Sequence, residues 1–201
     1  MNGLQTGSPA AVDESHLWLR EGRCGIGPYR SDLLETYLRW ESDPASMIGF
    51  GHQVPLSLDR RRQWLEVQLS NESMARFTVY DLSRDVPEPV GFTVLTRDNS
   101  APSAEYALMI APEARRRGFA VRATLLTVDY GFHISCLRTI WLQTLAPNTR
   151  ALRAYRRCGF QEQGRLRETG RWLGEPCDTV LMDMQPNDLP RTSVVRPLLP
   201  S

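Results

Sequence analysis

The sequence lacks several features that would place it in a specialised class of protein. It has no apolar run approaching the roughly 20 residues that a helix needs to cross a bilayer. Its N-terminus is polar and lacks the charged-then-apolar pattern of a secretion signal. Its formal net charge is only +1, whereas a dedicated nucleic-acid-binding protein normally carries a strong basic excess. We therefore expect a cytoplasmic protein that binds neither membranes nor nucleic acids.

Cysteine and histidine are scarce as well. The four cysteines form no C-x-x-C pair and the three histidines are scattered, so no metal-ligand spacing is present and we expect no metal. Widely spaced cysteines of this kind favour reduced, structural thiols in the cytoplasm. A nucleophilic Cys158 is the alternative, although no histidine stands in a recognisable partner pattern. The cysteines are Cys24, Cys136, Cys158 and Cys177, and the histidines are His16, His52 and His133.

The composition that remains is that of an ordinary globular domain. Of 201 residues, 41% are hydrophobic and 23% are charged. This length favours a single domain with a substantial core, which we expect to span residues 15–185. Residues 1–14 are rich in small polar residues and are expected to form a disordered leader. Residues 186–201 are Pro-rich and are expected to form a tail that is disordered or binds a partner.

Hydrophobic periodicity predicts a mixture of strands and helices. Helices are expected over residues 31–42, from residue 57, from near residue 116 and over residues 148–157. Gly25, Gly27 and Pro28 are expected to break the first strand, and residues 45–55 to form an irregular loop. This order predicts an α+β fold, with a mixed, mostly antiparallel central sheet and about four flanking helices. Strands are expected at residues 16–20, 76–82, 90–96, 104–110, 139–145, 161–167 and 179–184.

The stretch from residue 104 to residue 134 organises the rest of the chain. A buried strand ends at Pro112, and a basic turn then leads into an amphipathic helix. The first amides of a helix have no partner within the helix, and the helix dipole adds positive charge, so this turn suits a phosphate. Gly118 allows the backbone to approach an anion closely, and a solvated basic turn is the alternative. The turn consists of Arg115, Arg116, Arg117, Gly118, Phe119 and Ala120.

A second pattern begins 33 residues after Arg115 and reads Asn148-x-x-Ala151-x-x-x-Tyr155-x-x-x-Gly159-Phe160. Together with Arg115-x-x-Gly118-x-Ala120, it resembles the two signature motifs of the GNAT superfamily of acyl-CoA-dependent N-acetyltransferases, in the order that the family shows. The loop over residues 170–178 and the strand after it resemble the branch with ribosomal-protein, polyamine and antibiotic N-acetyltransferases. The resemblance covers roughly residues 16–185.

The resemblance implies a GNAT-like sheet in which two parallel strands splay apart, and an enzyme that uses acetyl-CoA. The acetyl group would pass directly to a primary amine of a small molecule, such as an amino acid derivative, an amino sugar or an antibiotic-like metabolite. No long acidic tract marks a polycationic acceptor. The alternatives are a protein N-terminal acetyltransferase of the ribosomal-protein type and a non-catalytic acyl-CoA-binding regulatory or interaction module. A homodimer is left open.

The resemblance also assigns roles to residues. Tyr155 would protonate the departing thiolate, and a backbone N–H near Met109 or Ile110 would stabilise the oxyanion. Packing in the core is the alternative for Tyr155, and capping of its own helix explains Asn148 equally well. The residues expected to bind coenzyme A are Leu108, Met109, Ile110, Arg115, Arg116, Arg117, Gly118, Phe119, Ala120, Asn148 and Arg153.

The general base is the least determined role. Glu105 is the first candidate, because a carboxylate within a buried strand is costly unless it is solvated or paired. It lies one residue closer to the arginine turn than the glutamate of histone-type relatives, and such an offset reverses the face of a strand side chain unless a bulge corrects it. Glu41, His52 and an amine that arrives deprotonated are the alternatives. The acceptor pocket is expected among Trp40, Phe50, His52 and Trp172, which ordinary core or lid packing would also explain.

Overall fold

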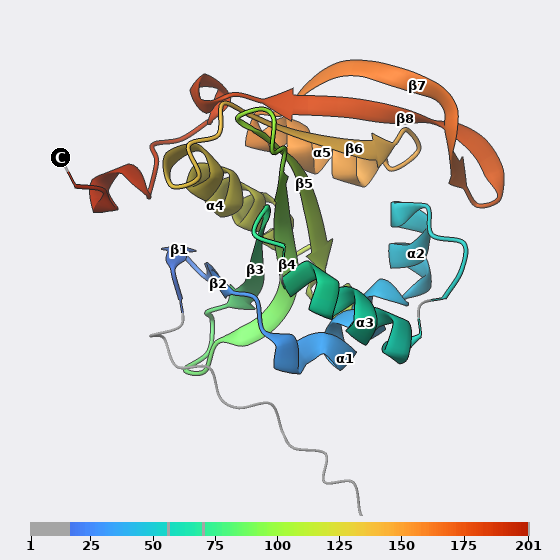
Figure 1. Cartoon of the computed structure of the whole chain (residues 1–201), viewed down its shortest axis with the longest axis horizontal. Coiled ribbons are helices and arrows are strands. Elements are labelled where there is room, and N and C mark those ends of the chain that lie inside the picture. The colour runs from blue at the N-terminus through green and yellow to red at the C-terminus, as the bar shows by residue number, and fades with distance from the viewer. Residues whose placement is uncertain (1–16, 56, 70, 201) are drawn as a thin grey trace, which may run out of the picture.

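The computed structural model describes residues 17–55, 57–69 and 71–200, so the expected leader lies outside the described residues. Eight strands form one sheet (Figure 1). They are β1 Leu19–Glu21, β2 Cys24–Pro28, β3 Met74–Asp81, β4 Glu88–Arg97, β5 Ser103–Ile110, β6 Thr139–Leu145, β7 Gln161–Trp172 and β8 Glu175–Met184. Their order is β1-β2-β3-β4-β5-β6-β8-β7, and every neighbouring pair is antiparallel except β5 and β6. The predicted α+β fold with a mostly antiparallel sheet is confirmed.

The parallel strands β5 and β6 separate soon after they meet. They pair only from Ser103 opposite Thr139 to Glu105 opposite Trp141. Beyond this point β5 stays paired with β4, and β6 stays paired with β8. From Tyr106 onward the facing edges of β5 and β6 are therefore open, and we call this opening the strand gap. It is the splay that the family resemblance implies.

Five α-helices of the described chain cover the two faces of the sheet (Figure 1). Successive residues of β3 show which face each helix covers, because side chains alternate along a strand. The Phe77 ring packs edge-on against Tyr130 of α4, whereas the Thr78 hydroxyl lies 2.7 Å from the Tyr37 hydroxyl of α1. Helices α1–α3 lie on one face, and α4 and α5 on the other. The helices are α1 Leu34–Glu41, α2 Pro44–Phe50, α3 Leu58–Leu69, α4 Phe119–His133 and α5 Thr149–Cys158.

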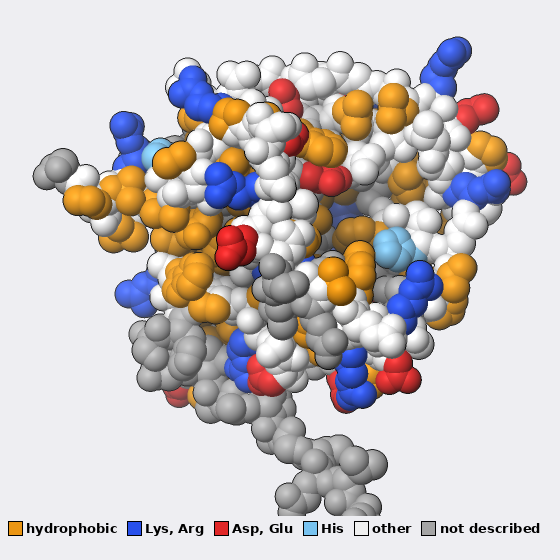
Figure 2. Space-filling model, in the orientation of Figure 1, with side chains coloured by type: hydrophobic (Ala, Val, Ile, Leu, Met, Phe, Trp, Pro, Cys, Tyr) orange, Lys and Arg blue, Asp and Glu red, His pale blue; other side chains and the backbone are white. Residues whose placement is uncertain are grey.

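The face that carries α1–α3 is hollowed between the β7–β8 hairpin and α2 (Figure 2). Both elements project to the right of the central strands in Figure 1, and residues of both line a pocket between them. No helix in the described part of the chain is long and apolar enough to cross a membrane.

The prediction that Gly25, Gly27 and Pro28 break a strand is wrong, because all three belong to β2. This strand pairs on both edges, with β1 and with β3. Gly25 lies in a crowded position, since a Cβ there would be 3.1 Å from Leu17 and 3.2 Å from Leu82. The small residue is needed for packing rather than for a turn. The predicted first strand at residues 16–20 is shortened and shifted to β1.

The prediction of a loop over residues 45–55 is also wrong, because residues 44–50 form α2. Asp43 caps this helix by accepting a hydrogen bond from the Ser46 amide at 3.0 Å. Pro44 fits the first turn, where its missing N–H costs nothing. Gly51 ends the helix with a φ of 69°, in the left-handed region that favours glycine.

The helix expected from near residue 116 begins instead at Phe119. Arg116 and Gly118 have positive φ values of 64° and 84°, so neither can continue a right-handed helix. At the other end of the chain, β7 and β8 extend well beyond the predicted strands. The loop expected around residues 170–177 is reduced to a tight turn at Leu173 and Gly174, where φ is again positive.

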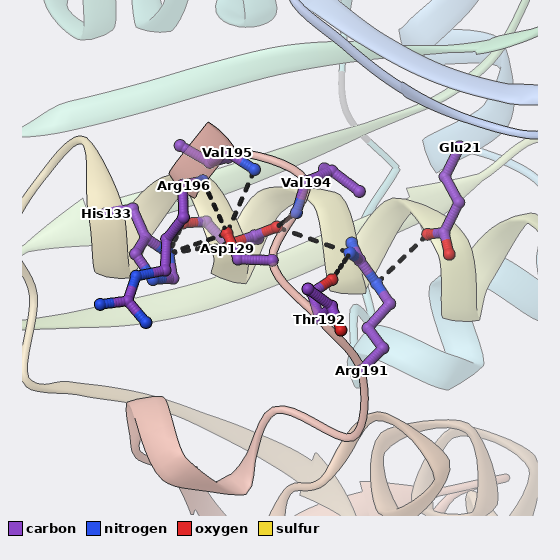
Figure 3. Close-up of polar contacts among 9 residues, drawn as sticks. Glu21, Asp129, His133, Arg191, Thr192, Val194, Val195 and Arg196 are labelled. Carbon is purple, nitrogen blue, oxygen red and sulfur yellow. Dashed lines mark hydrogen bonds and ion pairs between the residues drawn. The ribbon is translucent and has the colours of Figure 1, made fainter. Parts of the chain in front are cut away.

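The expected disorder after residue 185 is not found over residues 186–200, and residues 191–196 lie beside α4 (Figure 3). The cause is Asp129 of α4, whose side chain is fully buried. Its carboxylate accepts hydrogen bonds from the Ser193 hydroxyl at 2.5 Å and the Val194 amide at 2.8 Å. Arg191 lies 3.5 Å from the same carboxylate. Val195 is 1% exposed in the core, so a buried acid and one apolar anchor hold a Pro-rich segment in place.

Candidate active site

The N-terminus of α4 presents a row of backbone amides without partners. Gly118 is the N-cap residue and no side chain caps the helix. The first bond of the helix runs from the Arg122 amide to the Gly118 carbonyl at 3.4 Å, and the amides of residues 116–121 bond to no described residue. Such a row, at the positive end of a helix dipole, suits a phosphate. We call this row the amide cradle.

Gly118 and Arg122 shape the entrance of the amide cradle. A Cβ on Gly118 would lie 2.7 Å from Nη1 of Arg122, one helical turn further on. The guanidinium therefore folds back over the glycine and adds charge to the cradle. Arg122 was not predicted from the sequence, although its spacing of four residues from Gly118 places it on the same side of the helix.

Arg115 fixes the position of α2 and is already paired. Its Nη1 lies 2.8 Å from Oδ2 of Asp43, and its Nη2 donates to the Ser46 hydroxyl at 2.5 Å. Burial alone would raise the pKa of Asp43, but the bonds from Arg115 and Ser46 hold that pKa below its usual value. The charge of Arg115 is thus largely neutralised.

Arg117 is also paired, whereas Arg116 is not. Arg117 forms an ion pair with buried Asp81, and its guanidinium lies 5.2 Å from the centre of the Phe119 ring. Arg116 is exposed and forms no ion pair with any described residue. Of the three consecutive arginines expected to supply charge to a phosphate, only Arg116 is not held by a described carboxylate. Arg116 and Arg122 are cations at the cradle that no described carboxylate neutralises. A third is Arg23, which donates to the Arg117 carbonyl at 3.2 Å.

The register of β5 shows which backbone groups face the strand gap. The Ala111 amide donates to the Val90 carbonyl at 2.9 Å, which fixes the ladder between β4 and β5. Bonding alternates along an antiparallel ladder, so the backbone of Met109 is directed toward β4. The N–H groups of Leu108 and Ile110 are directed toward the strand gap. Of the two N–H donors expected from the sequence, the register favours Ile110 and adds Leu108.

Tyr155 lies beside the start of the strand gap on the face of α4 and α5. Its ring packs against Tyr106 of β5 and against Phe160, with centroid distances of 6.4 and 5.8 Å. Burial raises the pKa of the Tyr155 hydroxyl well above its usual value, so the group stays protonated. The Tyr106 hydroxyl is occupied by Thr124 at 2.9 Å, whereas that of Tyr155 bonds to no described residue. Tyr155 thus packs in the core, as the alternative interpretation predicts. Its hydroxyl proton is not donated to any described residue.

Glu105 lies on the opposite face of β5. It is the last residue of β5 that is paired with β6, and the β4–β5 register runs through it without a bulge. Its Oε1 accepts a hydrogen bond from Nε2 of Gln143 at 3.3 Å. Trp141 stands opposite Glu105 in register and so shares its face. Trp141 and Gln143 were not predicted as site residues, because residues 139–145 were interpreted only as a buried strand.

Asn148 caps α5, as the alternative interpretation predicts. Its Oδ1 accepts from the Ala151 amide at 3.2 Å. The cap leaves Nδ2 unused, and this atom lies toward Gly49 of α2, 3.6 Å from where a Cβ would be. Gly159 ends α5 with a φ of 102°, as predicted. Arg153 is exposed on α5 and pairs with no described carboxylate.

The expected acceptor residues are only partly brought together. His52 lines a shallow pocket of about 190 Å³ between the end of α2 and the β7–β8 hairpin, together with Arg171. The half-exposed Phe50 packs edge-on against His52, with ring centroids 5.8 Å apart. Trp172 follows Arg171 in the hairpin and is partly buried. Trp40 instead belongs to the core, because it is 1% exposed and its indole N–H donates to Glu113.

Glu41, the alternative base, is committed to another residue. It accepts two hydrogen bonds from Arg61 of α3, at 3.0 and 2.9 Å, in a buried fork. Burial raises the pKa of Glu41, and the Arg61 charge opposes this increase. A carboxylate held in this way joins α1 to α3 and is not available to accept a proton from an amine.

The sequence of this chain is similar to those of known proteins. Residues 23–161 match the family model described as an acetyltransferase (GNAT) domain. The chain is 32% identical to the spermidine N(1)-acetyltransferase of Vibrio cholerae serotype O1 over 113 residues, which are 56% of this chain and 64% of that protein. It is 38% identical to the spermidine N(1)-acetyltransferase of Escherichia coli strain K12 over 134 residues, 59% of this chain and 70% of that protein. The match to the Vibrio protein thus spans less than two thirds of its length.

A solved structure agrees at the level of the fold. The spermidine N-acetyltransferase from Vibrio cholerae in complex with CoA and spermine has a TM-score of 0.75 to this chain. The identity is 24%, and the match covers 83% of this chain and 97% of the other. The family model covers more than half of the sequence and includes the strand gap and the amide cradle. The chain belongs to the GNAT acetyltransferase family.

Proposed function

We propose that the protein is an acetyl-CoA-dependent N-acetyltransferase that acts on a primary amine of a small molecule. The observation that carries this proposal is that the amide cradle follows the strand gap along the chain. β5 ends at Ile110, beside the open end of the gap, and the amides of residues 116–121 come after a short turn. An extended thioester arm that ends in a pyrophosphate needs both a free strand edge and an anion site beyond it. The family assignment and the names of the relatives support the same reaction.

The residues of the site fit coenzyme A. The amides of residues 116–121, with Arg116 and Arg122, would hold the pyrophosphate, and Gly118 leaves room for it. The free edge of β5 would bond to the amides of the pantetheine arm, and Nδ2 of Asn148 offers one more donor. Bound acetyl-CoA would supply an acetyl group activated as a thioester.

The reacting groups would be handled from both sides of β5. Glu105, oriented by Gln143, accepts the proton of the incoming amine through water on one face. Tyr155 holds a proton for the leaving sulfur on the other face, where its raised pKa keeps it protonated. An N–H group on the free edge of β5, that of Ile110 or that of Leu108, would stabilise negative charge on the carbonyl oxygen. Holding both reactants in one orientation provides much of the remaining rate enhancement.

The test is the release of free thiol from acetyl-CoA across a panel of small amines, measured beside direct binding of CoA. Tyr155→Phe should lower turnover by about 100-fold or more with CoA affinity unchanged. The proposal would be wrong if the wild-type protein bound acetyl-CoA but released no thiol with any amine. That result would favour a non-catalytic acyl-CoA-binding module. Transfer to peptide N-termini alone would favour a protein N-terminal acetyltransferase.

Two further properties belong to this proposal. A homodimer is supported by β7, which is an edge strand exposed along most of its length and therefore a template for pairing. A monomer by light scattering at assay concentration would contradict the homodimer. A cytoplasmic location is supported by four cysteines that are all free.

A further inference from the structure

An arginine lies on the acceptor side of the sheet, next to the helices. Thr78 of β3 faces α1, so Arg76, two residues earlier, points to the same face. Arg76 stands opposite Val94 of β4, which in turn stands opposite Ala107 of β5. Ala107 is exposed, and Glu105, two residues earlier in β5, lies on the same face of the sheet. Arg76 thus borders the open floor from which an amine would approach Glu105.

Arg76 is partly buried and pairs with no carboxylate among the described residues. Its one hydrogen bond to a described residue goes to the Met74 sulfur, at 3.0 Å. Its guanidinium lies 5.9 Å from the centre of the Tyr29 ring. Burial lowers the pKa of Arg76, and the charge of nearby Arg61 lowers it further. A partly buried cation without a counter-ion loses hydration, and a ligand that supplies an anion would offset this loss.

Tyr29 offers a second unused polar group beside Arg76. Its hydroxyl oxygen is buried and has no hydrogen-bond partner in the described part of the chain. Its ring packs against Tyr37, with centroids 4.8 Å apart, so the hydroxyl is held in place. Burial raises the pKa of Tyr29 to about 12, so the hydroxyl remains a donor. Arg76 and Tyr29 together provide forked N–H donors and an O–H donor, the set that suits a carboxylate.

Two of the described carboxylates near Arg76 are already paired with arginines. Glu41 is held by both arms of Arg61, and Glu35 of α1 pairs with Arg62. Glu105 keeps its charge, because its hydrogen-bond partner Gln143 is neutral, but this charge lies at the strand gap, where the reacting amine is expected. Between Glu105 and α3, Arg76 is a cation that no described carboxylate neutralises. A second ammonium group placed beside Arg76 would be repelled.

We propose that the acceptor is an amine that also carries a carboxylate, and that Arg76 with Tyr29 binds this carboxylate while the amine reaches Glu105. The proposal rests on the proposed acetyltransferase function and specifies its substrate class. Arg76 lies two strands from β5, and neighbouring strands are about 4.8 Å apart. The spacing suits a carboxylate several bonds from the amine, as in a diamino acid or a dipeptide.

The experiment compares acids with their amides as acceptors. Thiol release from acetyl-CoA is measured with lysine and lysinamide, with glycylglycine and its C-terminal amide, and with spermidine. The wild type should prefer the acid of a pair by about 10-fold or more in kcat/KM, the usual effect of a charge-assisted hydrogen bond. Arg76→Gln should remove this preference by raising KM for the acid while KM for the amide stays the same. Tyr29→Phe should reduce the preference by a smaller factor.

Controls separate recognition from folding. Arg62→Gln removes an exposed arginine from α3 and should keep the preference for the acid. Arg76→Lys keeps the positive charge and should retain part of the preference for the acid. If Arg76 acted only by packing its planar guanidinium, lysine would not retain this preference. Melting temperatures verify that each variant is folded.

Three results would overturn the inference. In the first, the amide serves as well as the acid in the wild type. In the second, spermidine is the best acceptor, which leaves the proposed acetyltransferase function intact. In the third, Arg76→Gln raises KM for acid and amide equally, which means that Arg76 supports the fold rather than the substrate. Absence of thiol release with every amine, despite acetyl-CoA binding, would overturn the proposed function as well.

Discussion

Replacement of Gly118 by glutamate should abolish coenzyme A binding and leave the fold intact. Gly118 has a φ of 84°, where any other residue is strained by about 1 kcal/mol. A Cβ would approach only the guanidinium of Arg122, at 2.7 Å. Because that group ends a flexible side chain, it can move aside. The fold should therefore lose little, and the melting temperature should fall by about 2–4 °C for each kcal/mol.

The loss of binding should be much larger than the loss of stability. The new carboxylate would lie in the amide cradle, where the pyrophosphate of the cofactor is expected. Two like charges about 4 Å apart in partly screened surroundings repel by about 4 kcal/mol. That energy corresponds to a roughly 1,000-fold increase in the Kd of CoA. Filling the space left by the missing Cβ adds to this effect.

The assay is calorimetric titration of CoA into each variant, with thermal unfolding measured in parallel. Gly22→Glu is the matched control, because Gly22 also has a positive φ of 57° and a Cβ there would meet nothing within 4 Å. It should show a similar loss of melting temperature and bind CoA as the wild type does. Gly118→Ala introduces the strain without the charge and should weaken binding by a smaller factor. If Gly118→Glu bound CoA within threefold of the wild type, the amide cradle would not be the pyrophosphate site.

Three further predictions concern stability. Gly159→Ala should lower the unfolding free energy by about 3 kcal/mol, because its Cβ would lie 2.2 Å from the Asp188 carbonyl at a positive φ; a melting temperature within 2 °C of the wild type would contradict this. Asp129→Ala should cost about 3 kcal/mol, because Arg191 loses its buried partner, and should expose the C-terminal segment to trypsin; unchanged proteolysis would show that other contacts hold the segment. The pKa of folded Tyr29 is about 12, above its unfolded value, so its contribution is complete below about pH 10 and is lost as pH rises through 12. The unfolding free energy measured with urea should fall less steeply between about pH 10 and 12 for Tyr29→Phe than for the wild type. Identical slopes would show that Tyr29 does not have the raised pKa.

The parts of the site that follow from the sequence are those set by contiguous backbone. Gly118, Asn148 and Gly159 mark helix ends, and their structural roles depend on residues within four positions along the chain. The parallel pairing of the two strands around the crossover helix follows from the same local patterns. The amide cradle could therefore be predicted from the sequence, whereas the strand gap followed only from the family resemblance.

The partners of the charged residues could not be found in this way. Arg115 binds Asp43, 72 positions away, and Arg117 binds Asp81, 36 positions away. A sequence pattern cannot distinguish three consecutive arginines from one another, yet tertiary contacts neutralise two of them. Helix α2 was missed for a related reason, since its seven residues are too few to show a period and its ends depend on Asp43 and Gly51.

The same difference separates the two halves of the proposed active site. The cofactor half is made largely of backbone groups, which any family member with the same turn can present, and the resemblance to relatives is informative there. The acceptor half as proposed depends on side chains such as Arg76 and Tyr29, and its charge depends on which acids are already paired. Glu41 beside Arg61 illustrates this, because a carboxylate that would attract a polyamine is neutralised by one arginine of α3. Names of relatives therefore predict the reaction of this chain better than its acceptor, and Arg76 is the residue on which that acceptor should depend.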